Sequence, residues 1–282
     1  MTHATTHAVT PPLPQPDIAT VGELVRTAAF AEILSRARDP HARRKTDGSI
    51  VTDADLAMQR HLQTALSARW PAIALLGEEM TPDMQSALLR DEAAAPDGPG
   101  LWVLDPLDGT SNFAAGIPAF GPSLAWLQGG RVRLGVVFDV MRDELFAAAE
   151  GQGATLNGAP LRLPGEDGRT LARSMACVDF KRLPAPLATR LATAAPYASQ
   201  RAIGSVAIEW CWVAAGRFHV YLHGAQGLWD YAAAQLILRE AGGVSRTLQG
   251  EPVFAQTLEK RSALCATDPT LLDAWAGWVN GH

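Results

Sequence analysis

The sequence predicts an α/β protein with two lobes, and two patterns support that prediction. In the first part of the chain, helical runs come first and are followed by runs typical of an extended, largely antiparallel sheet. From Arg169 onward, strand-like and helical runs alternate, as they do in an α/β lobe. We therefore expect a disordered leader over 1–16, an N-terminal lobe over 17–168 and a C-terminal lobe over 169–282 that completes the site.

The composition is that of an ordinary globular protein and argues against several other classes. The 282 residues are 48% hydrophobic and carry a net charge of -5, which predicts a sizeable core and no nucleic-acid or anionic-membrane partner. The only basic cluster is residues 43–45. No apolar run approaches the roughly 20 residues that span a bilayer and no signal peptide is recognisable, so the predicted location is cytoplasmic. The three cysteines are too few and too widely spaced to suggest disulfides or a zinc site.

The first predicted elements are two helices. Apolar residues recur at helical spacing from about Ile18 to Arg38, and a second helix should run from Thr52 toward Trp70. Asp55 falls in the first turn of the second helix. Thr52 and Asp55 can form a capping box that only stabilises the helix, or Asp55 can be a carboxylate held rigidly near a functional site.

Two short apolar runs without alternation, 73–76 and 101–104, predict strands that are buried on both faces. The first run ends in Gly77-Glu78-Glu79, and the second ends in Asp105-Pro106-Leu107-Asp108. Each strand would therefore deliver acids at its carboxyl end. Residues 91–100, which are rich in Ala, Pro, Gly and acids, are predicted to form an exposed loop.

The second of these strand ends has the pattern of a cation site. Asp105 and Asp108 are three residues apart across a proline turn, so both carboxylates and the Leu107 carbonyl can face one small volume and form an oxygen cage for a hard cation. Gly109 and Thr110 can then open a helix whose free N–H groups attract phosphate. The alternative is a strand followed by an ordinary type I turn.

The remaining elements complete both lobes. The predicted strands lie at 123–128, 132–140, 145–149, 175–178 and 218–222, and the predicted helices at 187–194, 204–215 and 231–241. Gly129-Gly130 and Asn157-Gly158 predict hairpin turns. His219 and His223 are four apart, but the residues around them alternate as in a strand, which argues against a metal pair on a helix. Asp230 starts the last helix, either as its N-cap or as a further acid of the cage.

Four acids, Glu78, Asp105, Asp108 and Asp230, cannot pack together as bare anions. Each close pair of like charges would force protonation or push the loops apart, so divalent cations must accompany the cluster. Ligands that are all carboxylate and carbonyl oxygens, without His or Cys, select Mg²⁺ or Mn²⁺. Pairs of such ions, about 3.5–4 Å apart, hydrolyse phosphate esters.

Four segments resemble the inositol monophosphatase family of the lithium-sensitive, magnesium-dependent phosphatase superfamily. They are Asp47-Gly48-Ser49 through Asp53-Ala54-Asp55, Gly77-Glu78-Glu79, Trp102 through Phe113, and Trp229 through Gly243, with weaker matches at 151–158 and 204–207. The resemblance extends from about residue 18 to the C-terminus. It implies a layered αβαβα sandwich of the inositol monophosphatase and fructose-1,6-bisphosphatase type, a homodimer, and inhibition by Li⁺.

The resemblance also implies a metal arrangement of two to three Mg²⁺ ions, for which Mn²⁺ could substitute. One ion would bind Glu78, Asp105 and the Leu107 carbonyl. A second would bind Asp105, Asp108 and Asp230, so that Asp105 bridges the two. A weaker third ion would lie near Glu78.

The resemblance places the catalytic and substrate residues around these ions. Asp55 and Thr110 would surround the attacking water, with Glu78 as a further catalytic acid. The N–H groups of Gly109 and Thr110 would hold the phosphate oxygens. Other substrate contacts would come from Gly204, Ser205 and His223.

The predicted function is hydrolysis of a small phosphomonoester, with inositol 1-phosphate as the leading substrate, by direct attack of water. Histidinol phosphate, 3′-phosphoadenosine nucleotides and fructose bisphosphate are alternatives within the superfamily. A non-catalytic regulatory or binding protein on the same fold is an alternative of another class. His223 stands where inositol-cleaving relatives usually carry an acid, so we predict that it lines the leaving-group pocket and that small phosphomonoesters are poorly discriminated. The alternative is that His223 merely ends its strand and another residue takes over this role.

Overall fold

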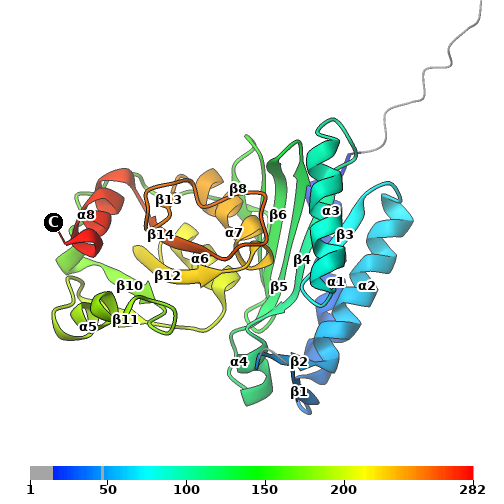
Figure 1. The fold of residues 1–282 in the computed structure, drawn as a ribbon, viewed down its shortest axis with the longest axis horizontal. Helices are drawn as coiled ribbons and strands as arrows, with labels where there is room; N and C mark the ends of the chain where they lie inside the picture. The colour runs from blue at the N-terminus through cyan, green and yellow to red at the C-terminus, as the bar shows by residue number, and fades with distance from the viewer. Residues whose placement is uncertain (1–14, 46–47, 282) are drawn as a thin grey trace, which may run out of the picture.

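The computed structural model describes residues 15–45 and 48–281, which fold into five alternating layers of helices and sheets (Figure 1). The helices of the three helical layers are, in order across the molecule, α1 (Ile18–Glu32) and α2 (Asp53–Arg69), then α6 (Val206–Ala214) and α7 (Leu228–Glu240), then α5 (Ala185–Thr193) and α8 (Pro269–Asn280). A seven-stranded sheet separates the first two helical layers, and a five-stranded sheet separates the last two. This arrangement confirms the predicted αβαβα architecture.

The seven-stranded sheet is largely antiparallel, as predicted. Its order is β3-β4-β5-β6-β7-β8-β9, and only β3 and β4 are parallel. Its strands are β3 (Ala74–Gly77), β4 (Leu101–Asp108), β5 (Gly121–Gln128), β6 (Arg131–Asp139), β7 (Glu144–Ala149), β8 (Ala154–Leu156) and β9 (Ala159–Leu161). Every residue of β4 is buried. The strand extends through Asp108, four residues beyond the predicted run, and its register with β5 shifts between Asp105 and Asp108.

The five-stranded sheet is mixed, with the order β11-β10-β12-β14-β13. Its strands are β10 (Met175–Val178), β11 (Ser199–Arg201), β12 (Val220–Gln226), β13 (Val244–Arg246) and β14 (Arg261–Ala266). β12 is parallel to β10 and antiparallel to β14, so the carboxyl end of β12 lies beside the start of β14. The two sheets lie on either side of the predicted lobe boundary, which itself stays a prediction.

The core is divided by the seven-stranded sheet. On the outer face, Trp102 of β4 packs against Trp70 and Trp126 at ring-centroid distances of 5.6 and 6.4 Å. On the inner face, α7 lies so close to β6 that a Cβ on Gly135 would stand 2.7 Å from the carbonyl oxygen of Ala233. Only glycine permits this approach, which fixes α7, and the acid in its first turn, against the sheet.

Several boundaries differ from those predicted. The first helix ends at Glu32 and continues as the short 3₁₀ helix η1 (Leu34–Arg36). Helix α3 (Pro82–Ala94), which was not predicted, includes the first four residues of the expected loop at 91–100. Its start carries the usual signals, since Thr81 is the N-cap and Pro82 is the first helical residue. Polar residues on most faces of α3 hid its periodicity.

Two corrections concern residues near the candidate site. β12 begins at Val220 rather than at residue 218 and runs on to Gln226, so His223 lies within the strand and His219 lies outside it. The N-cap of α7 is Gly227, and Asp230 occupies the third helical position instead. The Asp230 carboxylate accepts a hydrogen bond of 2.7 Å from the Gly227 N–H, so it caps the helix from inside its first turn.

Three further findings complete the fold. A small hairpin of β1 (Ala42–Arg44) and β2 (Ile50–Thr52) precedes α2, and its tip residues 46–47 lie outside the described residues, as does most of the predicted leader. The strands β11, β13 and β14 and the helix α8 were not predicted. In the described part of the chain, no helix is both long enough and apolar enough to cross a membrane.

Candidate active site

Parallel pairing of β3 and β4 brings the first acids together. Gly77 pairs with Leu104 in this ladder, and the Glu78 N–H donates a hydrogen bond of 3.0 Å to the Leu104 carbonyl. Because parallel strands end at the same edge of a sheet, Glu78 is held beside Asp105. β4 is buried along its whole length, as predicted, whereas β3 is an edge strand with Ala74 exposed and Leu75 half-buried, so the prediction that both strands are buried on both faces is wrong for β3.

The helices α6 and α7 complete the cluster from the C-terminal half of the chain. The Asp108 carboxylate accepts hydrogen bonds of 2.6 Å from both the Ser205 hydroxyl and the Ala207 N–H, at the beginning of α6. The partial positive charge of a helix N-terminus favours such a carboxylate. At the start of α7, the Trp229 carbonyl accepts a hydrogen bond of 3.1 Å from Ser123 of β5, which holds the neighbouring Asp230 next to the end of β4.

The electrostatics show that the four acids are neighbours. Burial raises the pKa of Asp105 well above its usual value, and repulsion from Glu78, Asp108 and Asp230 adds to this effect. Burial likewise raises the pKa of Asp230 well above its usual value, and it raises the pKa of Glu78 to about 7. A bare cluster would therefore hold protons at neutral pH unless cations replaced them.

The donor set of the cluster fits a hard divalent cation. Asp105 and Asp230 each use one carboxylate oxygen in a hydrogen bond to backbone N–H, of Leu107 and Gly227 respectively, and no hydrogen bond from the described residues reaches the other. Among the described residues, however, no three His, Cys, Asp or Glu side chains lie close enough together to hold a metal ion as they stand. The fit therefore rests on the chemical type of the oxygens.

Asp55 and Thr110 meet although they come from different helices. One Asp55 oxygen accepts hydrogen bonds from the Thr52 N–H at 2.7 Å and the Thr52 hydroxyl at 2.5 Å, while the other accepts from the Thr110 hydroxyl at 3.1 Å. The two interpretations of Asp55 are therefore compatible, because one oxygen caps α2 and the other faces the candidate site. Burial raises the pKa of this carboxyl to about 6.

Helix α4 (Thr110–Ala115) follows β4 directly, as predicted, and a glycine makes the sharp change of direction possible. Gly109 has a φ of +86°, and a Cβ there would lie 2.8 Å from the carbonyl oxygen of Ala119. Only glycine fits this position. The first N–H groups of α4 have no partner within the helix, which leaves them free for an anion.

The predicted substrate residues of the C-terminal half already have partners in the protein. The Gly204 N–H donates to Glu209 at 2.9 Å, and Ser205 is fully buried against Asp108. The His223 side chain is 5% exposed, with Nδ1 accepting from the Ala225 N–H at 3.2 Å and Nε2 lying 3.2 Å from Asp179. This pattern places the His223 proton on Nε2, where it donates to the Asp179 carboxylate.

Two residues near the site were missed by the sequence reasoning. The Nζ of Lys45 lies 2.6 Å from Glu79 and 3.5 Å from Glu78. The basic run at 43–45 enters the sequence analysis only as evidence on nucleic-acid binding. Asp179 directly follows β10, which is parallel to β12. An acid after an apolar strand is the signal that identified Glu78, and it could have identified Asp179 too.

Together, the αβαβα layers and the cluster of buried and half-buried acids define a layered α/β protein with an acidic centre suited to hard cations. The chain belongs to the inositol monophosphatase family, whose sequence model matches residues 15–279.

Individual relatives agree with this assignment. The chain is 36% identical to the Nus factor SuhB of Pasteurella multocida over 205 residues. This matched segment covers 71% of this chain and 72% of the relative. It is 26% identical to inositol monophosphatase 1 of Bos taurus, with coverage of 89% and 87%. A crystal structure of SaIMPase-II with inositol monophosphate bound superposes with a TM-score of 0.72, at 25% identity and with coverage of 92% and 91%.

Proposed function

We propose that this protein is a Mg²⁺-dependent phosphomonoesterase that hydrolyses a small phosphate monoester by direct attack of water. The observation that carries the proposal is the cluster of Glu78, Asp105, Asp108 and Asp230, whose burial is costly unless cations neutralise it. Family membership supports phosphatase chemistry, and the related bovine protein is named as an inositol monophosphatase.

The acids and the Leu107 carbonyl would hold the ions as the resemblance implies. When bound, Mg²⁺ would polarise the phosphate and lower the pKa of an adjacent water. The protein's own contribution is positional. Asp105 lies within the fully buried strand β4, close enough to Glu78 after β3 and to Asp230 of α7 that both raise its pKa.

The Asp55–Thr110 pair is suited to orient the attacking water. The Thr110 hydroxyl lies 2.9 Å from the Leu107 carbonyl oxygen and 3.1 Å from Asp55, so it can donate its one proton to either, and its oxygen can still accept a hydrogen bond from water. With a pKa of about 6, Asp55 is ionised at pH 7 and is a stronger proton acceptor than an ordinary Asp. The N–H groups at the start of α4 would bind the phosphate oxygens.

The leaving group would face the carboxyl ends of β10 and β12. His223 uses both ring nitrogens within the protein, so it is better placed to orient Asp179 than to contact a sugar hydroxyl itself. The Asp179 side chain is 31% exposed and can accept hydroxyls. We therefore propose that the acid absent from position 223 is supplied from the neighbouring strand.

A phosphate-release assay tests this function. The purified chain is incubated with inositol 1-phosphate, glycerol 2-phosphate and histidinol phosphate in Mg²⁺, in Mn²⁺ and in EDTA, with millimolar Li⁺ in a further arm. Turnover with Mg²⁺ that EDTA abolishes is expected, together with inhibition by Li⁺. No release from any ester at saturating Mg²⁺ would overturn the proposal, whereas insensitivity to Li⁺ alone would change only the proposed subfamily.

A second candidate is a regulatory partner of the transcription machinery. The observation that favours it is the similarity to proteins named Nus factor SuhB. An inactive chain that nevertheless co-purifies with RNA polymerase would support this candidate. A homodimer also stays a prediction, and sedimentation of the purified chain would test it.

A further inference from the structure

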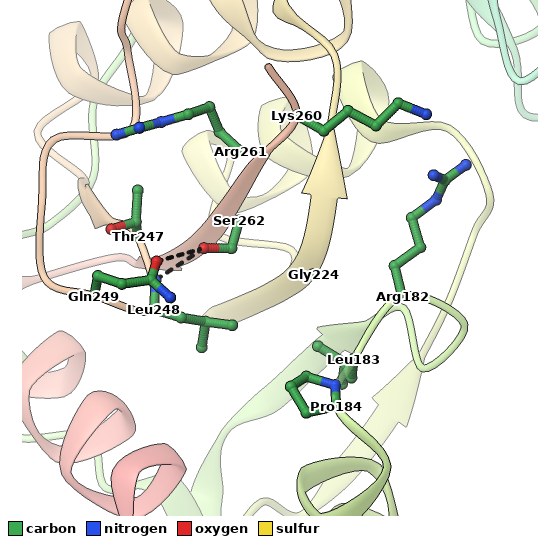
Figure 2. A pocket seen from close by; sticks show the side chains of 10 residues that line it. All are labelled: Arg182, Leu183, Pro184, Gly224, Thr247, Leu248, Gln249, Lys260, Arg261 and Ser262. Atoms are coloured by element: carbon green, nitrogen blue, oxygen red, sulfur yellow. Dashed lines mark hydrogen bonds between the residues drawn. The ribbon is translucent and has the colours of Figure 1, made fainter.

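A cavity of about 390 Å³ lies beside the five-stranded sheet, and none of the four clustered acids lines it (Figure 2). It is lined by the loop after β10, the end of β12, the turn after β13 and the residues that begin β14. These segments are 182–184, Gly224, 247–249 and 260–262. We call this cavity the cation pocket, because its lining contains Arg182, Lys260 and Arg261 and no acid.

Two of the three cations in the pocket differ from the third in their direct contacts. Arg182 and Lys260 are exposed, and neither side chain makes a hydrogen bond or ion pair with the described residues. Arg261 differs, because it pairs with Glu251 at 3.1 Å and donates to the Pro252 carbonyl at 2.9 Å. Figure 2 shows Arg182 and Lys260 extending to the same side of Gly224, while Arg261 points the opposite way. The two unpaired cations are therefore available to one ligand.

The pocket adjoins the candidate active site. The loop after β10 presses on β12 so tightly that a Cβ on Gly224 would stand 1.8 Å from the Arg182 carbonyl oxygen. Gly224 directly follows His223, and the same strand leads to Gly227, which caps the helix of Asp230. Lys260 is also close enough to Asp230 to oppose the rise of its pKa, and Arg182 contributes to lowering the pKa of Asp179.

We propose that the cation pocket binds a second anionic group on the substrate, a phosphate or a carboxylate carried by the leaving group. This inference rests on the proposed phosphomonoesterase function and specifies its substrate class. A neutral polyol would leave both cations without a partner, whereas an anion would gain charge-assisted hydrogen bonds from each. The Ser262 and Gln249 side chains offer further polar groups on the opposite wall.

Matched substrate pairs test the proposal kinetically. Fructose 1,6-bisphosphate is compared with fructose 1-phosphate, and 2-phosphoglycerate with glycerol 2-phosphate, so that each pair differs by one anion. We expect the doubly anionic member of at least one pair to show a kcat/KM about tenfold higher or more, and the pair that responds identifies phosphate or carboxylate as the ligand. The Arg182→Ala/Lys260→Ala variant should lose most of that preference, and KCl should weaken it in the wild type.

Lys181→Ala is the matched control. Lys181 is exposed and adjacent to Arg182, but it does not line the pocket. Its loss removes a nearby charge of the same sign, so an effect of net charge alone would appear in this variant too. A preference reduced as much by Lys181→Ala as by the double variant would overturn the pocket, and so would a wild type without preference in either pair.

A binding measurement separates failure of the pocket from failure of the phosphatase proposal. The full chain in EDTA is titrated calorimetrically with fructose 1,6-bisphosphate and with fructose 1-phosphate. The bisphosphate should bind at least about tenfold more tightly, and the double variant should bind both alike. If the wild type binds in this way but hydrolyses no ester, the pocket stands and the phosphatase proposal fails. If the wild type, like the double variant, binds the bisphosphate no more tightly than fructose 1-phosphate, the proposed pocket is overturned.

Discussion

Two groups of like charges lie beside the two sheets, and they differ in what those charges cost. The seven-stranded sheet ends in Glu78, Asp105 and Asp108, with raised pKa values that record the cost of burying like charges. Beside the five-stranded sheet, the cation pocket contains Arg182 and Lys260, which remain exposed and solvated at little cost. Under the proposed function, the acids beside the seven-stranded sheet would carry the reaction and the cations beside the five-stranded sheet would bind the leaving group, with large and small energetic effects respectively.

The largest effect should come from the centre of the acid cluster. Asp105→Asn removes the carboxylate that would touch two ions, so kcat should fall by about a thousandfold, or about 4 kcal/mol, at saturating Mg²⁺. Phosphate release measures the loss, circular dichroism checks the fold, and Asp83→Asn, at an exposed position of α3, is the control. Retention of more than about a tenth of wild-type turnover would rule out a bridging role.

A smaller loss is expected where the protein orients water. Thr110→Val keeps the side-chain shape but removes the hydroxyl that bonds Asp55, so kcat should fall by about a hundredfold with little change in KM. Thr64→Val is matched to it, because Thr64 is an exposed residue of α2 and its hydroxyl donates only to the Arg60 carbonyl. Equal activities of the two variants would show that Thr110 is structural.

Stability against pH should expose the cost of the acid cluster. Glu78 and Asp55 have folded-state pKa values of about 7 and about 6, above their unfolded values of 4.5 and 3.8. Their protonation therefore stabilises the fold below the unfolded pKa, and this contribution is lost as the pH rises through the folded pKa. In EDTA, Tm should fall by a few degrees between pH 5.5 and pH 8.

Mg²⁺ and one variant sharpen that measurement. Because cations compete with protons for the same oxygens, Mg²⁺ should raise Tm more at pH 8 than at pH 5.5. Glu78→Gln has no charge to lose, so its Tm in EDTA should depend less on pH. An identical dependence in the variant would show that the charge at Glu78 is already neutralised within the protein, for example by Lys45.

The smallest effect should come from the leaving-group side. Asp179→Asn replaces one acceptor oxygen with a donor, so kcat/KM for inositol 1-phosphate should fall about five- to tenfold, mostly through KM, and glycerol 2-phosphate should be less affected. Asp167→Asn, at an acid paired only with Arg169, is the control. If kcat/KM falls equally for both substrates, Asp179 does not contribute to recognition of the leaving group.

The parts of the site that could be predicted follow from patterns within short stretches of sequence. An apolar strand that stops at acids needs no knowledge of the rest of the chain, so the places of Glu78, Asp105 and Asp108 could be predicted. Capping signals behave in the same way, and they placed Asp55 in the first turn of its helix. The missed helix α3 shows the limit of this reasoning, because its start signals were present but its periodicity was weak.

The partners of these residues could not be predicted, because they come from distant parts of the chain. Ser205 was expected at the substrate, but packing of α6 turns its hydroxyl to Asp108. His223 was expected to line the pocket, but parallel pairing of β10 and β12 brings Asp179 within reach of its ring. A side chain's nearest polar neighbour depends on strand order and helix packing, which sequence spacing does not encode.

The sequence by itself determined the layered α/β class, the family, and the acids at the ends of buried strands, since all of these follow from short-range periodicity and motif spacing. Tertiary structure alone decided that one Asp55 oxygen caps α2 while the other meets Thr110, and that Arg182 and Lys260 share one cavity. The physical reason is that hydrophobic patterning fixes which face of each element is buried, whereas the meeting of charges depends on how whole elements pack.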